Sequence, residues 1–255
     1  MGAVERFLPD WRDADAYAPL LAADRPLLAW EWLRRDEAYR WAACQAAGMA
    51  GSCVAGPGRW GLHAFEPPDA AVPDARPVWR ADVHPYVLPV RAVPGADGDS
   101  LELEPLAPLC RLVEGSAGLQ HLLICDGLRS IRIDVVEGSI GEGGARLHYL
   151  IAGFEDAEKP LLTLRRLLAL RRTGHFPASL HSAGTRARRF VLMLRAYDAL
   201  ASGAGQREIA AWLLDGDALR DRWRVRAPSL RSRVQRLVGC ARTVAGGGYR
   251  ALLAA

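Results

Sequence analysis

The chain has 255 residues, of which 50% are hydrophobic, and its formal net charge at pH 7 is +4. This length supports a sizeable core and two or three subdomains. The sequence contains no apolar run of the roughly 18–20 residues that a membrane-spanning helix needs. Its first residues are charged where a secretory signal needs an apolar stretch. We therefore expect a cytoplasmic protein that does not bind membranes.

Positive charge is concentrated in the last hundred residues. Residues 155–255 contain 18 Arg, one Lys and 8 acidic residues, a net charge of +11, whereas residues 1–154 carry −7. This division indicates a polyanion-binding module beside a second part of different character. Nearly all of the cations are Arg, whose planar guanidinium can grip a phosphate or a guanine edge at two points. A GC-rich genome would explain Arg in place of Lys, but not the segregation of charge.

The sequence predicts no metal site, no cofactor and no enzyme activity. No two of the five cysteines have the short spacing of zinc ligands, and the six histidines form no HExxH motif. A GxSxG motif is also missing. Glu31, with Asp36 or Glu37, lies beside Trp residues and could form an acid of raised pKa. Helix capping and surface pairing with Arg34 and Arg35 are the favoured interpretations of these carboxylates.

We predict an α+β fold in three consecutive parts, of which residues 1–55 form an N-terminal helical module. A short helix is expected after Pro9. A second helix should begin near Pro26, because apolar residues then recur every three to four positions. Gly48 and Gly51 should end it. The module is therefore expected to be a compact helical pair, dense in Trp.

The middle part, residues 56–153, is predicted to be a small, mostly antiparallel β subdomain. It holds most of the prolines, and short β-like runs lie between its turn signals. Asp126-Gly127 and Glu142-Gly143-Gly144 look like hairpin connections. The expected strands are Tyr86–Ala92, Leu119–Cys125, Ser130–Val136 and Ala145–Ala152.

The last part, residues 154–255, is predicted to be entirely helical. Its order of long helix, glycine turn, short helix, connection and basic helix is typical of a helix-turn-helix. In the short helix, Ile209, Trp212 and Leu213 should face inward. The expected helices are Glu155–Arg172, Thr185–Ala201, residues 206–215 and Ser229–Val244.

The basic helix Ser229–Val244 has the pattern of a groove-reading helix. At about 100° per residue, one face is apolar, formed by Leu230, Val234, Leu237 and Ala241. The opposite face carries Ser232, Gln235, Arg236, Gly239 and Thr243, with Arg231, Arg233 and Arg242 beside it. Hydrogen-bonding residues between arginines suit base edges flanked by phosphates. An ordinary amphipathic helix with a solvated cationic face is the alternative, but such a helix often carries acidic partners, which this outer face lacks. The candidate DNA-binding residues are Gln206, Arg207, Arg224, Arg226, Ser229, Arg231, Ser232, Arg233, Gln235, Arg236 and Arg242.

Two stretches resemble known modules of bacterial regulators. REIAAWLL, followed by RVRAPSLRSRVQRLVGCARTVAGGGYRALL, resembles the RovC-type DNA-binding domain of proteobacterial transcriptional regulators. Relatives of that domain occur in regulators of type VI secretion and of conjugative-element transfer. WRDADAYAPLL, LAWEWLRRDEAYRWA and RWGLHAFEPPDA are similar to the module that often precedes it. The resemblance implies a variant helix-turn-helix and transcriptional control, but it identifies no base-contacting residues.

Together these observations favour a nucleoid-associated transcription activator that reads double-stranded promoter DNA with the helix 229–244. The acidic N-terminal part would then contact RNA polymerase, another regulator or a second copy of the chain. Because helix-turn-helix proteins often bind paired half-sites, we expect a homo-oligomer. The alternative is an antiactivator, or another protein-interaction module, that binds a second regulator instead of DNA.

Overall fold

The computed structural model describes residues 8–48, 55–95, 98–141, 144–181, 187–214 and 228–254. The chain forms two compact units, each built from two separate pieces of sequence. Unit 1 comprises Met1–Ala22 and Ala183–Tyr249, and unit 2 comprises Ala23–Ser182 and Arg250–Ala255. These boundaries differ from those of the three consecutive parts expected from the sequence. None of the described helices is long and apolar enough to cross a membrane.

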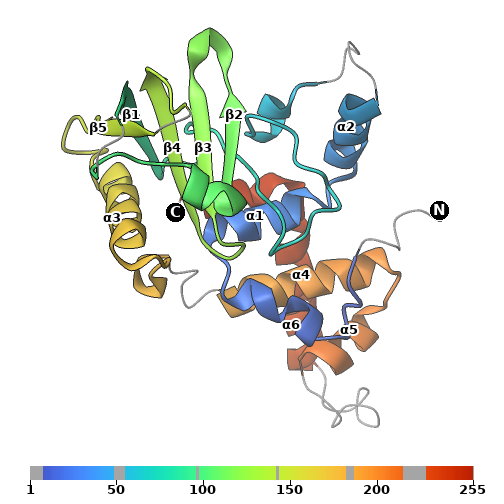
Figure 1. Cartoon of the computed structure of the whole chain (residues 1–255). Coiled ribbons are helices and arrows are strands. Elements are labelled where there is room, and N and C mark those ends of the chain that lie inside the picture. The colour runs from blue at the N-terminus through green and yellow to red at the C-terminus, as the bar shows by residue number, and fades with distance from the viewer. Residues whose placement is uncertain are drawn as a thin grey trace. The chain divides into compact units, whose positions relative to one another are not determined.

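A five-stranded sheet forms the centre of unit 2 (Figure 1). The strand order is β2-β3-β4-β1-β5. The β1–β4 pair is parallel and the other three pairs are antiparallel, so the expected α+β fold with a mostly antiparallel sheet is confirmed. The sequence analysis missed β2, a short edge strand whose residues are all at least partly exposed. The strands are β1 (Val87–Pro94), β2 (Cys110–Glu114), β3 (Gln120–Cys125), β4 (Ser130–Glu137) and β5 (Ala145–Tyr149).

Only one of the two expected hairpin connections is present. Asp126-Gly127 joins β3 to β4, and the Asp126 carboxylate accepts hydrogen bonds from the backbone amides of Leu128 and Arg129 at 2.8 and 2.7 Å. The hairpin expected at residues 142–144 is wrong. Although Glu142 and Gly143 lie outside the described residues, the strands on either side both pair with β1 and not with each other. A local turn signal cannot reveal that a distant strand will lie between its two neighbours.

Helix α3 (Glu158–Thr173) covers one face of the sheet (Figure 1). Its residues Leu167 and Leu170 are buried in one core with Leu88 of β1 and Ile133 of β4. Each of these buried leucines stabilises the unit by about 1.5–3 kcal/mol relative to an exposed side chain. Helix α3 lies in residues 154–255, the part predicted to bind DNA, but it packs against the sheet of unit 2.

An irregular segment, residues 55–86, contacts β3 and β4: the ring of His63 stacks on that of His121, and Arg132 donates to the Trp79 carbonyl at 3.1 Å. Two helices precede this segment in the chain. The helix expected to run on from Pro26 is broken into α1 (Arg25–Leu33) and α2 (Glu37–Gly48), because the Asp36 side chain accepts a hydrogen bond from the Tyr39 amide at 2.9 Å and caps a new helix. The indole of Trp79 donates to the Pro26 carbonyl at 3.1 Å, which ties the segment to α1. Short α7 (Arg250–Ala254) also contacts α1.

Glu31 is the centre of a buried ion cluster in α1. Its carboxylate lies 2.7 Å from both Arg34 and Arg35 and also accepts the Val72 amide at 2.8 Å. The expected pairing with these arginines is present, but it is buried and not at the surface. Burial by itself would raise the pKa of Glu31, but the two guanidinium groups and the amide hold it below its usual value. The result is a permanent anion, which is unsuited to act as an acid.

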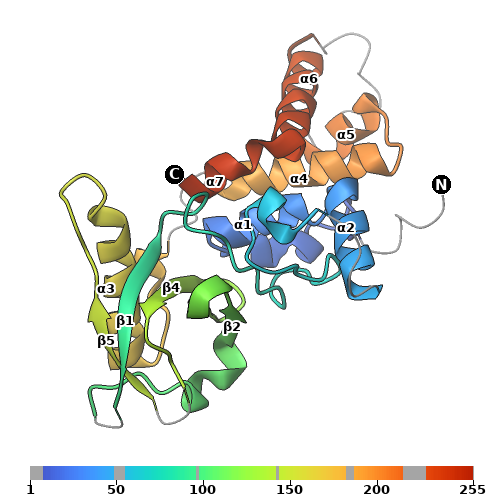
Figure 2. The ribbon, with the colours of Figure 1, turned by 90° about the horizontal axis from the view of Figure 1, so that it is seen from above.

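Unit 1 is helical. It contains α4 (Ala187–Ala201), α5 (Gln206–Leu213) and α6 (Pro228–Thr243), together with the 3-10 helix η1 (Asp15–Leu21) from the N-terminal segment. Helix α6 lies across α4 (Figure 2) and also contacts α5. A π-helical turn, η7 (Val244–Gly248), follows α6. The other short 3-10 helices among the described residues belong to unit 2: η2 (Pro57–Trp60), η3 (Glu104–Leu109), η4 (Ser116–Gly118) and η5 (Ala178–Leu180).

Candidate nucleic-acid interface

The apolar stripe of α6 packs into the core of unit 1. Leu230, Val234 and Ala241 are buried as predicted, but Val238 is buried in place of Leu237, which is only partly covered. The buried stripe is wider than predicted because α6 contacts both α4 and α5. The core that fixes the helix contains Trp11, Ala196, Ala199, Ile209, Ala210, Leu230, Val234 and Val238.

The face of α6 opposite this stripe is exposed and cationic. Six of the predicted DNA-binding residues lie on it, and all are exposed: Arg231, Ser232, Arg233, Gln235, Arg236 and Arg242. Within the described ranges, none of the four arginines has a carboxylate at ion-pairing distance. The guanidinium of Arg236 makes only a 3.3 Å hydrogen bond to the Ser232 carbonyl, one turn earlier. Among the described residues, no carboxylate therefore neutralises this surface charge.

Helix α5 begins beside two other predicted contacts. Gln206 and Arg207 form its first turn and are exposed, with Gly205 at the N-cap. Ile209 is buried as predicted, but Trp212 is 50% exposed, so its expected inward orientation is wrong. Its ring meets that of Trp11 edge-on at 6.4 Å, whereas Ala210 takes the buried position on this short helix.

Three predicted contacts are not placed by the structure. Arg224 and Arg226 lie outside the described residues. Ser229 lies in the first turn of α6, but its side chain is also outside them. Contacts of these three residues with DNA therefore remain predictions.

The sequence analysis did not assign the N-terminal segment to this unit. Trp11 is 2% exposed and belongs to the core beneath α5 and α6. The hydroxyl of Tyr17 donates to buried Asp198 of α4 at 2.7 Å, and Arg195 donates to the Trp11 carbonyl at 2.9 Å. Arg12 pairs with Glu208 of α5. The segment thus completes the fold that presents α6. Its aromatic residues were visible in the sequence, but their partners lie about 180 residues away.

A second cluster, in unit 2, contains the kinds of side chain that bind metals. His63, His121 of β3 and Asp134 of β4 place possible ligand atoms within 4.8 Å of one another. His121 Nδ1 lies 2.7 Å from an Asp134 oxygen, which also accepts from Arg132 at 2.8 Å. The Nε2 atom of His63 is buried and has no hydrogen-bond partner in the described part of the chain.

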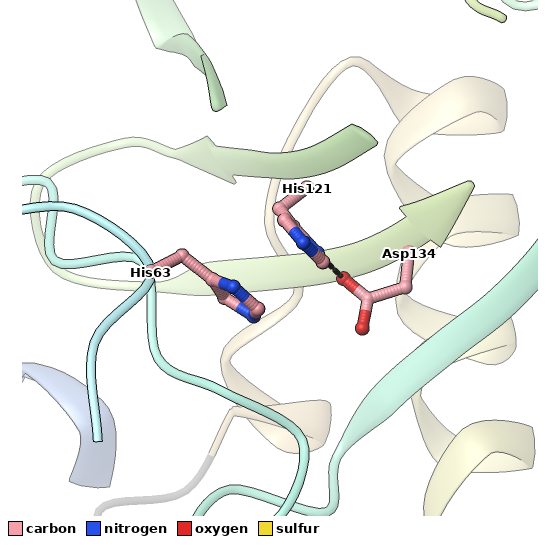
Figure 3. Close-up of side chains that lie close together, drawn as sticks. All are labelled: His63, His121 and Asp134. Carbon is pink, nitrogen blue, oxygen red and sulfur yellow. Dashed lines mark hydrogen bonds and ion pairs between the residues drawn. The ribbon is translucent and has the colours of Figure 1, made fainter. Parts of the chain in front are cut away.

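The geometry of this cluster is that of a hydrogen-bonded stack. The His63 and His121 rings lie face to face with centroids 3.4 Å apart and planes 20° apart (Figure 3). Two imidazoles that share an ion each aim a nitrogen at it from about 2.0–2.1 Å, which stacked rings do not do. Burial, the neighbouring His121 and Arg132 lower the pKa of His63 to about 4. His63 would have to leave the stack to bind a metal, and His121 is already oriented by Asp134.

Two family models match the chain. Residues 150–254 match the RovC DNA-binding domain, described as "T6SS, Transcription factor, DNA binding domain". Residues 10–63 match the "Proteobacterial transcriptional regulator-like domain". The chain therefore carries a RovC-type DNA-binding domain preceded by a proteobacterial transcriptional regulator-like domain. It is a DNA-binding regulator by its domains, and the family resemblance seen in the sequence is confirmed. No curated protein gives a significant match.

Both RovC-type family regions contribute to both structural units. The region 150–254 includes α4, α5 and α6 of unit 1, but also α3 and α7 of unit 2. The region 10–63 includes η1 of unit 1 and then α1 and α2 of unit 2. The DNA-binding region is therefore not an independent block at the end of the chain, because its helices share cores with N-terminal residues.

Proposed function

We propose that this RovC-type regulator activates transcription by placing the outer face of α6 in the major groove of promoter DNA. The observation that supports this proposal is the exposed face itself, which carries four arginines and no acidic residue, opposite the stripe that packs into the core. On a helix that faced only water, such a concentration of like charges would not stabilise the fold. A duplex offers phosphates on both sides of the groove and acceptor atoms on the base edges between them.

Each part of the face has a proposed role. Ser232 and Gln235, in the N-terminal half of α6, would meet base edges, because recognition helices usually read bases with their N-terminal residues. Arg231, Arg233, Arg236 and Arg242 would contact phosphates or guanine edges. Gln206 and Arg207, at the N-terminus of α5, would meet a phosphate together with backbone amides of that turn.

The activator is further proposed to be a cytoplasmic, nucleoid-associated homo-oligomer. The family match supports DNA as the partner, and pairing of two copies would place two α6 helices on successive half-sites about one helical turn of DNA apart. Analytical ultracentrifugation with and without DNA carrying the target site tests this arrangement. A monomer that binds DNA one to one would contradict it.

The test of the DNA-binding proposal begins with chromatin immunoprecipitation and sequencing of the bound DNA. A single enriched motif is the expected result, and a labelled fragment that contains it then serves for fluorescence anisotropy. The double variant Arg233→Ala/Arg236→Ala should bind this fragment at least about tenfold more weakly, since each lost contact costs about 1 kcal/mol or more. The control Arg165→Ala/Arg172→Ala removes the same charge from the exposed side of α3. Equal affinity of both double variants would refute the proposal.

A second candidate function is that of an antiactivator, or another protein-interaction module, that binds a second regulator instead of DNA. The observation in its favour is Trp41 on α2, which is 62% exposed although a tryptophan usually buries most of its surface. Binding of purified RNA polymerase or of a second regulator should then depend on Trp41→Ala and not on the α6 arginines. A flat chromatin profile combined with this dependence would favour the antiactivator.

A further inference from the structure

A cavity of about 250 Å³ lies within unit 2, between α1, α3, α7 and the residues just before β1. Its wall combines apolar and polar side chains. The apolar part includes Leu162 and Leu180 from the α3 side and Leu252 and Leu253 of α7. An apolar cavity of about 150 Å³ is large enough for benzene, so this one has room for a ligand of about ten non-hydrogen atoms.

One wall residue, Arg166 of α3, carries a cation without a direct counter-ion. Its Nε donates to the Leu180 carbonyl at 2.8 Å, and its guanidinium carbon lies 5.8 Å from the centre of the Tyr86 ring. Within the described residues, its terminal nitrogens have no hydrogen-bond partner. Burial lowers the pKa of this guanidinium, but arginine nevertheless stays protonated in proteins. The side chain is therefore a bidentate donor beside an open volume.

The nearest acid, Asp24, favours the charged form of Arg166 but makes no direct ion pair with it in the described residues. Asp24 also lines the cavity, but its two oxygens are used at the start of α1 and at β4. One accepts from the Leu27 amide at 3.3 Å, and the other accepts from the amide and hydroxyl of Ser130 at 2.7 and 2.6 Å. After burial, Asp24 has the largest influence on the pKa of Arg166 and favours its charged form, whereas Arg25, a second cation in the same wall, disfavours it more weakly. Because the Asp24 oxygens are held by Leu27 and Ser130, the terminal nitrogens of Arg166 stay available to a second anion.

The wall also offers a hydrogen-bond acceptor. His84 is 4% exposed, and its Nδ1 lies 3.1 Å from the Leu253 carbonyl of α7. A carbonyl oxygen can only accept, so Nδ1 carries the proton and Nε2 is left with a lone pair. Burial lowers the pKa of His84 to about 4, which keeps the ring neutral. In the described residues no group donates to this Nε2.

From this set of groups we propose that the cavity is a binding site for a small organic acid. A carboxylate would lie on the Arg166 guanidinium, and an apolar body would lie against Leu162, Leu252 and Leu253. A hydroxyl or amino group on the ligand would donate to His84 Nε2. Sites for small ligands usually combine such an apolar lining with a few polar groups that fix orientation.

Occupancy of this site would stabilise the docking of α7. The ligand would contact α7 directly, beside the hydrogen bond from His84 to the Leu253 carbonyl. The start of α7 is separated from the end of α6 by only the turn Val244–Gly248 and Tyr249. A ligand that holds α7 in place would restrict the movement of residues 244–249, which connect α7 to α6. The site would then act as an effector site.

The probes for the test are phenylacetate and its neutral isostere phenylacetamide, titrated into the full-length protein by calorimetry without DNA. Phenylacetate should bind at one site per chain. Phenylacetamide should bind at least about tenfold more weakly, since a hydrogen bond to a charged group contributes about 1.5–3 kcal/mol. Because no DNA is present, failure of this experiment is distinct from failure of the proposed DNA binding.

Three variants localise the binding. Arg166→Gln should weaken phenylacetate by about tenfold or more, and Leu252→Trp should abolish binding by filling the cavity. Arg165→Gln, an exposed neighbour on the same helix, should bind like the unaltered protein. Thermal denaturation without ligand verifies that each variant is folded. The proposal is overturned if phenylacetate shows no saturable binding up to about 10 mM, a concentration about ten times a dissociation constant of about 1 mM. Equal binding of the amide, or unchanged binding by both Arg166→Gln and Leu252→Trp, also overturns it.

Discussion

The two units use arginine in opposite ways. In unit 2, Arg34 and Arg35 share buried Glu31. Arg132, 2% exposed, donates to Asp134 at 2.8 Å and to the carbonyls of Trp79 and Leu122 at 3.1 and 3.0 Å. In unit 1, the four arginines of α6 are exposed, and within the described ranges they have no acidic partner. The same side chain holds together the interior of one unit and charges the surface of the other.

This contrast shows why an arginine count does not locate a nucleic-acid surface. Removing a buried guanidinium from water costs several kcal/mol, so it persists only where hydrogen bonds and anions surround it. Such a group is unavailable to a phosphate. An exposed arginine contributes little to stability, but it can exchange water and counter-ions for a phosphate. A concentration of exposed arginines without acidic partners on one helix face is therefore the property that marks the proposed interface.

The largest expected effect comes from removing the buried anion of unit 2. Glu31→Gln leaves Arg34 and Arg35 buried with one neutral acceptor, and it should lower the free energy of unfolding by about 3–5 kcal/mol. Urea denaturation measures the change. Asp82→Asn, which breaks an exposed ion pair with Arg80, is the matched control and should change stability by no more than about 1 kcal/mol. Similar losses in both variants would remove the distinction between buried and exposed arginines.

A somewhat smaller effect is expected from pH. Burial lowers the pKa of His84 from 6.5 to about 4. The unfolded chain therefore binds more protons between these values, and stability falls as the pH drops from 6.5 towards 4. For His84 this amounts to about 3 kcal/mol. His63 and His181, with pKa values lowered to about 4 and about 3, act in the same direction. Asp24, raised to about 6 by burial, opposes them, because its contribution falls as the pH rises from 3.8 through 6.

Unfolding curves across this pH range test the assignment to His84. His84→Asn preserves a donor for the Leu253 carbonyl but cannot bind a proton, so its stability should fall less between pH 6.5 and 4. The exposed His148→Asn variant serves as the control. An unchanged slope in His84→Asn would show that this histidine is not the origin of the loss. The arginines of α6 should take no part, because guanidinium groups stay charged throughout this range.

Local patterns in the sequence were sufficient to find most of the helices and strands. The basic helix was predicted at Ser229–Val244 and is found at Pro228–Thr243, because a 3.6-residue apolar repeat specifies both a helix and its buried side. The exposed face of α6 follows from the same repeat. Strand β4, predicted at Ser130–Val136, is found at Ser130–Glu137 for a comparable reason, since β-branched residues lie between clear turn signals.

Pairing between distant segments was not predictable. The position of β1 between β4 and β5 depends on tertiary contacts, and so does the packing of Trp11 beneath α6. Neither leaves a periodic signal. The burial of Arg132 was also hidden, because a charged residue in a strand normally indicates a solvent-facing position. The cavity beside Arg166 combines residues separated by as many as 229 positions along the chain, from Asp24 to Leu253, and no spacing rule brings them together.

Unit 1 also buries a carboxylate, that of Asp198. The hydroxyl of Tyr17 donates a hydrogen bond to it, whereas the buried Glu31 of unit 2 pairs with arginines. Tyr17→Phe removes the 2.7 Å hydrogen bond to Asp198, which is 2% exposed. The expected loss is about 1–3 kcal/mol, because a buried acceptor loses a donor that water cannot replace. Tyr149→Phe, at a 41% exposed residue of unit 2, is the control for loss of a hydroxyl. If Tyr17→Phe is as stable as this control, the N-terminal segment does not support the unit that presents α6.

The smallest effect on stability is expected on α6 itself, where the effect on DNA binding should be clear. Arg233→Ala/Arg236→Ala should change the free energy of unfolding by no more than about 0.5 kcal/mol per site, because both side chains are exposed.

If Arg233 and Arg236 both contact phosphates, the slope of the logarithm of DNA affinity against the logarithm of salt concentration should become shallower by about 2 in this double variant. Gln235→Ala should leave that slope unchanged and reduce discrimination between sequences, since a neutral side chain releases no counter-ions. Anisotropy titrations at several salt concentrations separate these cases. A large loss of stability in the double variant would mean that these arginines hold the fold, as those of unit 2 do.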